Sequence, residues 1–105
     1  MLVNCAVYQR GRKVADIALS EIRDHRAQPD SFVWVALKDV EPGELESLQD
    51  EFDLHELAIE DAHHGHQRPK LDEYGQSLFV VLQILEPSEE ELHAGEVAIF
   101  VGPGY

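Results

Sequence analysis

Three short apolar runs limit what this chain can fold into more than any other feature. They are "FVWVAL" (32–37), "QSLFVVLQIL" (76–85) and "EVAIFVG" (96–102). The longest uninterrupted apolar stretch is the six residues of 32–37, whereas a transmembrane helix needs about 20. Runs of this length that are rich in β-branched residues predict strands, and the first two are typical of strands covered on both faces. The last two runs predict an antiparallel hairpin with a long, charged connection.

The amino-terminal third of the chain predicts further short strands. Residues 2–9 ("LVNCAVYQ") and 14–19 ("VADIAL") are strand candidates separated by a turn at "RGRK". The polar segment 20–30 predicts one helical turn or a loop. Trp34, inside the first apolar run, is expected in the core.

Two consecutive helices are predicted in the middle of the chain. Pro42 suits the first position of a helix, and apolar residues at helical spacing form its expected buried stripe: Leu45, Leu48 and Phe52. A second short helix is predicted over 54–64, with Gly65 as its carboxyl-terminal cap and Pro69 preventing its continuation.

Helices and strands follow one another without strict alternation, which favours the α+β class. We therefore expect a mixed β-sheet packed with short helices. The length of 105 residues suits a single domain spanning 1–105, and the sequence contains no internal repeat or low-complexity tract.

The charge of the chain favours cations as partners. Lys and Arg number 8 against 21 Asp and Glu, which gives a formal net charge of −13. This excess argues against binding to nucleic acid or to anionic lipid, because both need cationic side chains. Cys5 is the only cysteine, so an internal disulfide is excluded and a reducing compartment is favoured. We expect the chain by itself to be soluble.

The sequence gives little support for a catalytic function, and we expect that this protein is not an enzyme. Cys5 lies in a predicted strand, where a buried structural thiol is the favoured interpretation. The glycine-containing "GPGY" (102–105) lacks the lysine and the helix of a phosphate-binding loop. No serine lies in a nucleophile-elbow context.

The segment "EDAHHGHQRPK" (60–70) concentrates the polar residues that could bind a metal. A magnesium ion would use the carboxylates of Glu60 and Asp61, whereas zinc would prefer three imidazoles: those of His63, His64 and His66. The segment also suits a solvated helix end, where histidine and arginine favour the helix dipole and pair with acids, and this is the favoured interpretation for such a cluster by itself. The residues alone leave these interpretations open.

A longer stretch of the chain resembles a known family. The segment "LHELAIEDAHHGHQRPKLDEYGQSLFVVL" (54–82) is similar to the amino-terminal cytoplasmic domain of CorA-type magnesium and cobalt transporters. This segment is the specific part of the resemblance, above all around "HQRPK" (66–70). The whole similarity extends over 32–105, while 1–31 fits only loosely. It implies a truncated form of an α/β/α sandwich domain. It also implies a subunit of a homopentamer in the inner or plasma membrane, with this domain sensing Mg²⁺ on the cytoplasmic side.

The resemblance assigns metal-binding roles to two residues only, Glu60 and Asp61. In the family, acids at these positions line divalent-cation sites between subunits, and partner carboxylates come from a neighbouring chain. The expected regulatory ion is Mg²⁺, with Co²⁺ as a second candidate. The histidines are not required by the family pattern. Arg68, Pro69 and Lys70 are interpreted as architecture, with the two cations pairing to nearby acids.

The chain departs from the full family pattern in one major respect. The two transmembrane helices and the Gly-Met-Asn pore signature of the family are absent. We therefore expect a fragment that self-associates, as a dimer, through an open sheet edge. The alternative functions are the cytoplasmic domain of a related zinc transporter and a stand-alone acidic interaction module.

Overall fold

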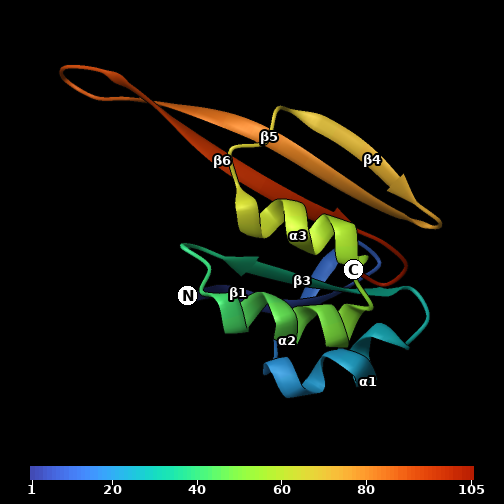
Figure 1. Ribbon diagram of the computed structural model, residues 1–105. Coiled ribbons are helices and arrows are strands. Elements are labelled where there is room, and N and C mark those ends of the chain that lie inside the picture. Colours follow the sequence, from blue (N-terminus) through green and yellow to red (C-terminus); the bar gives the residue numbers. More distant parts are fainter. The chain divides into compact units, whose positions relative to one another are not determined.

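The structure is a computed structural model that describes all residues, 1–105, and it confirms the α+β class (Figure 1). Its six strands form two three-stranded sheets, and every strand pair is antiparallel. The sheets are therefore not the one mixed sheet that we expected. The chain divides into two compact units, which comprise residues 1–54 with 103–105 and residues 55–102.

The sheet of the first unit has the order β2-β1-β3. Strand β1 (Leu2–Gln9) is central and pairs with both β2 (Arg12–Asp16) and β3 (Ser31–Leu37). The turn between β1 and β2 consists of Arg10 and Gly11, which both have positive φ angles of 51° and 79°. Positive φ at both central residues is what a tight hairpin with the normal strand twist requires.

The helices of the first unit bury the residues that the sequence pattern predicts. A 3₁₀ turn (η1, Leu19–Glu21) leads into α1 (Ile22–Arg26), whose Ile22 is completely buried. Helix α2 (Pro42–Phe52) begins at its proline as expected. The predicted stripe on α2 is confirmed, because its buried residues are Leu45, Leu48 and Phe52.

Residues 103–105 belong to the first unit. The Val33 amide donates to the Gly104 carbonyl at 2.8 Å, and Gly104 has a φ of +83°. A Cβ atom at this position would lie 2.8 Å from the Arg26 side chain, so a glycine is needed here. The Arg26 guanidinium lies over the Phe52 and Tyr105 rings, whose centroids are 4.8 Å apart.

Strand β3 has only one well-buried face, which corrects two expectations. Val33 is 2% exposed, whereas its neighbours Phe32 and Trp34 are 39% and 51% exposed. The prediction of a strand covered on both faces is wrong, and so is the placement of Trp34 in the core. Side chains alternate between the two faces of a strand, and an antiparallel sheet can leave one face in water.

The second unit contains α3 (Glu56–His64) and a sheet of order β4-β5-β6. Its strands are β4 (Lys70–Tyr74), β5 (Ser77–Pro87) and β6 (Leu92–Val101). The predicted hairpin is confirmed, with β5 paired to β6 from Leu78–Val101 to Pro87–Leu92. Its connection is shorter than expected because residues 92–95 lie within β6. Strand β4 was not predicted, since its sequence "KLDEY" is mostly polar.

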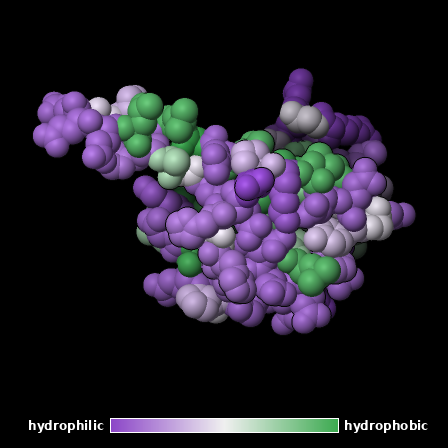
Figure 2. Space-filling model, turned by 45° about the horizontal axis from the view of Figure 1, so that its top comes forward, coloured by the Kyte–Doolittle hydropathy of each residue, from purple (hydrophilic) through white to green (hydrophobic).

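The core of the second unit occupies only one end of its hairpin. Ala58, Phe79 and Val81 are each 1% exposed, and they pack with partly buried residues of the same unit: Ala62, Tyr74 and Phe100. Beyond this point the hairpin extends past β4 (Figure 1), and β5 is exposed from Leu82 to Pro87. Figure 2 shows hydrophobic side chains among hydrophilic ones on this distal arm. The prediction of a buried strand over 76–85 thus holds only for its first half.

None of the helices combines the length and the apolar character that a membrane span requires.

Candidate cation-binding site

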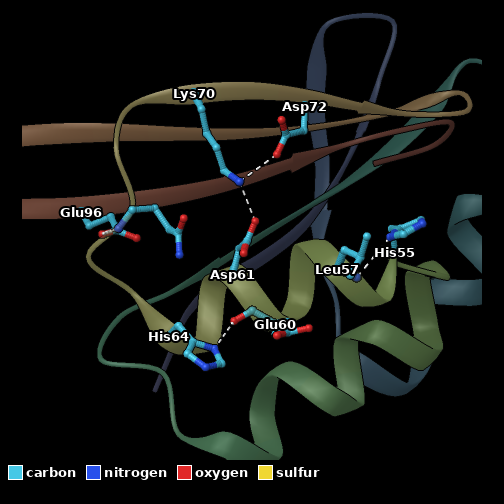
Figure 3. Close-up of polar contacts among 9 residues, drawn as sticks. His55, Leu57, Glu60, Asp61, His64, Lys70, Asp72 and Glu96 are labelled. Carbon is cyan, nitrogen blue, oxygen red and sulfur yellow. Dashed lines mark hydrogen bonds and ion pairs between the residues drawn. The ribbon is translucent and has the colours of Figure 1, made fainter.

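Helix α3 carries both predicted ligand residues, and both of its ends are capped locally. At its start, the Leu57 amide donates to Nδ1 of His55 at 3.1 Å, and the His55 ring stacks on Tyr74 with centroids 4.1 Å apart. At its end, the Gly65 amide donates to the Asp61 carbonyl at 3.1 Å, and Gly65 has a φ of +64°. The predicted role of Gly65 as the cap is confirmed. These contacts fix the helix that presents Glu60 and Asp61 (Figure 3).

The Asp61 carboxylate is bonded to a cation of its own chain. Its Oδ2 atom accepts from Nζ of Lys70 at 2.5 Å, and the same ammonium donates to Oδ2 of Asp72 at 2.8 Å. The Lys70 ammonium also lies 5.7 Å from the centroid of the Phe79 ring. The hydrogen bond to Asp61, followed by that to Asp72, raises the pKa of Lys70 well above its ordinary value. Lys70 therefore pairs with nearby acids as predicted, whereas Arg68 is an exposed side chain.

Glu60 presents its carboxylate in a different direction. Consecutive residues of an α-helix are rotated by about 100° around its axis, and Figure 3 shows the Glu60 side chain pointing away from Asp61 and Lys70. Glu60 is exposed, while Asp61 is only partly exposed. The two acids are adjacent in sequence, but their carboxylates do not converge on one point within this chain.

The three histidines next to the acids do not gather around a common centre. His64 uses Nδ1 to contact the Glu60 carbonyl at 2.9 Å, so this nitrogen carries the proton. His63 is exposed on the last turn of α3, and exposed His66 lies beyond the helix with a φ of +53°. No three or more histidine, cysteine or acidic side chains lie together in a geometry that could hold a metal.

The available donors match a hard divalent cation in chemistry. Mg²⁺ takes oxygen ligands, keeps several of its waters, and is commonly held by only one or two carboxylates. Exposed Glu60 could supply one such ligand, and Asp61 could supply another if it released Lys70. The assignment of Glu60 and Asp61 as metal ligands stays a prediction.

Sequence reasoning missed one member of this polar cluster, Asp72. Residues two apart on a strand share a face, so Lys70 and Asp72 lie side by side once 70–74 is a strand. The alternation of "KLDEY" was the available signal, but the run is too polar for a strand to be predicted from it. A second missed contact anchors the segment after α3, where the Gln67 amide donates to the Glu96 carboxylate at 3.1 Å (Figure 3).

Comparison with known proteins gives a consistent result. The sequence model of a family described as "CorA-like Mg2+ transporter protein" matches residues 29–105. Over 76 residues, the chain is 43% identical to a Bacillus subtilis (strain 168) protein named "Putative metal ion transporter YfjQ". The matched region is 71% of this chain but only 23% of that relative, so the chain spans about a quarter of its length.

Proposed function

Because this chain belongs to the CorA-like family of metal ion transporters, we propose that it is the cytoplasmic, ion-sensing part of a magnesium and cobalt transporter. The observation that carries the proposal is the family match over 29–105. This range includes α2, α3 and the whole second sheet, and therefore both acids of the candidate site.

In this proposal, Glu60 and Asp61 each contribute a carboxylate to a regulatory Mg²⁺ ion between subunits. Their separate directions on α3 suit two ligands that are completed by other chains rather than by each other. An assembly of several copies, which we propose to be a homopentamer at the plasma membrane, would bring strongly acidic surfaces together. Bound divalent cations would offset part of the charge of −13 on each chain and so reduce the repulsion between copies.

The proposed sensing mechanism follows from this electrostatic balance. At high Mg²⁺ concentration, ions at Asp61 and Glu60 hold neighbouring copies together. When the ions dissociate, repulsion between the acidic surfaces separates the copies, and this separation would open a conduction path. Co²⁺ can occupy the same oxygen ligands. The zinc alternative would use the three histidines as one ligand set, and within this chain they do not come together.

The proposal is tested in the transporter that carries this chain. Asp61→Asn and Glu60→Gln should each weaken the Mg²⁺-dependent protection of the domain against proteolysis, and the double variant should abolish it. Asp24→Asn removes the same charge from an exposed position in the first unit and serves as the control. If the double variant keeps the same Mg²⁺ dependence as the control, the assigned role of these acids is wrong.

A further inference from the structure

The Lys70 ammonium already bonds one oxygen of the Asp61 carboxylate, the group that would bind a cation at this site. It lies between two carboxylates, at 2.5 Å from Asp61 and 2.8 Å from Asp72. The three side chains are similarly enclosed, with exposed fractions of 29% for Lys70, 30% for Asp61 and 36% for Asp72. The contact joins the last turns of α3 to the first residues of β4 within the second unit.

A divalent ion and this ammonium cannot share Asp61 without cost. Both would bind the same carboxylate, and two positive charges within a few ångströms repel each other strongly. Lysine is a flexible point charge on a four-carbon stem, so its ammonium can move to another acceptor. Asp72 already holds Lys70, and the face of the Phe79 ring lies within reach of the same ammonium.

We infer that Lys70 competes within the chain with a divalent cation for Asp61, and that Asp72 holds the lysine when the ion binds. This inference rests on the proposed function, because it takes Asp61 as an ion ligand. Its consequence is regulatory: Lys70 lowers the affinity of the site, so the site fills at a higher ion concentration than the bare carboxylate would require. Asp72 limits that reduction by giving the displaced ammonium a partner.

The test is a Mg²⁺ titration of the assembled transporter that carries this chain, with protection of residues 56–64 against proteolysis as the measure of binding, at constant ionic strength. Lys70→Met keeps the length and much of the apolar stem of the side chain but removes the competing cation. We expect it to bind Mg²⁺ about two- to fivefold more tightly than the wild type, the range that one partly exposed ion pair supports. Arg68→Met is the matched control, since it removes a positive charge two residues away on an exposed side chain. It should change the affinity much less.

A second variant keeps the inference falsifiable if Lys70→Met does not fold. Asp72→Asn leaves Asp61 as the only acid bonded to Lys70, so it should weaken Mg²⁺ binding about two- to fivefold. In the Lys70→Met background, where that variant folds, Asp72→Asn should have no further effect. A further loss there would identify Asp72 as an ion ligand and would overturn its role as the acceptor for lysine.

The outcomes separate this inference from the proposed function. If Lys70→Met and Arg68→Met strengthen binding equally, or if Asp72→Asn leaves the affinity unchanged, the competition is refuted while Asp61 can remain a ligand. If Asp61→Asn binds Mg²⁺ at α3 as the wild type does, the proposed role of Asp61 fails and the inference fails with it.

Discussion

The two units of this chain are built from similar parts but contain very different numbers of buried apolar residues. Each has a three-stranded antiparallel sheet, yet the first unit contains nine of the thirteen buried apolar residues and the second contains four. The first unit has two α-helices in addition to its 3₁₀ turn, whereas the second has only α3. In the second unit, strand β5 of the hairpin is exposed from Leu82 onward. The comparison teaches that strand pairing alone does not create a core.

The same contrast extends to the polar contacts. In the second unit, the ion pairs of Lys70 with Asp61 and Asp72 lie beside the small apolar cluster and contact its Phe79 ring. In the first unit, ion pairs such as Lys13 with Asp16 lie on β2, a strand whose residues are all exposed. The second unit thus combines a small core with a polar cluster that includes Asp61 of the candidate site. The following substitutions test this contrast, beginning with the largest expected effect.

Phe79→Ala should cause the largest loss of stability. Phe79 is 1% exposed and packs on the Phe100 ring at a centroid distance of 4.9 Å, so its truncation should cost about 3–5 kcal/mol. Phe32→Ala is the control, because that ring is 39% exposed and stacks on Tyr8; it should cost about 1 kcal/mol. Urea denaturation of both variants measures the difference. Equal losses would contradict the assignment of Phe79 to the core.

Ile22→Ala tests the larger core of the first unit. Ile22 is completely buried on α1, so the substitution should cost about 2–5 kcal/mol. Alkylation of Cys5 reports on opening of this unit, because the thiol is buried. Burial, with a smaller effect from Asp16 and Glu21, also raises its pKa and keeps it protonated. We expect Ile22→Ala to accelerate alkylation more than Phe79→Ala does; the reverse order would show that Cys5 does not report on the first unit alone.

Lys70→Met should change the stability at alkaline pH. A lysine with a raised pKa in the folded state contributes stability that is complete below its unfolded pKa of about 10.4. This contribution is lost as the pH rises through the folded pKa, so the wild type should lose stability above about pH 10 and Lys70→Met should lose less. Urea denaturation at pH 9, 10 and 11 measures the two slopes.

Lys13→Met, a variant in the first unit, serves as the comparison for the loss of stability that Lys70→Met should change at alkaline pH. The hydrogen bond to Asp16 also raises the pKa of Lys13, but this pair lies on an exposed strand. We therefore expect a smaller change in slope for Lys13→Met than for Lys70→Met. If the two variants had the same slope, the enclosure of the Lys70 cluster would have no energetic consequence.

Ile84→Thr should have the smallest effect of the set. Ile84 is 47% exposed on the distal hairpin, so the change should stay within about 0.5 kcal/mol. Val81→Thr introduces a hydroxyl at a position of the same strand that is 1% exposed, and it should cost about 1–3 kcal/mol. Urea titrations of both variants measure their free energies of unfolding, from which the two losses of stability are compared. A large loss from Ile84→Thr would show that the distal arm is covered in solution.

Much of the local structure was predictable because neighbouring residues encode it. Pro42 at the start of α2, its buried stripe and the end of α3 at Gly65 all depend on contacts within a few residues. Glu60, Asp61 and Lys70 could also be singled out from the sequence segment that contains them. Asp72 could not, because its role depends on a strand, β4, that is recognised only through its pairing with β5.

The sequence by itself determined the α+β class, the start of α2 at Pro42 and the end of α3 at Gly65, since these follow from residue type and spacing along the chain. Its resemblance to known sequences identified the family. Only the tertiary structure decided which apolar residues are buried. Trp34 and Ile84 lie in runs that look like core strands, but each side of a strand is buried only if another element covers it. The tertiary structure likewise decided that Asp61 holds Lys70, because that bond joins a helix to a strand whose position the local sequence does not specify.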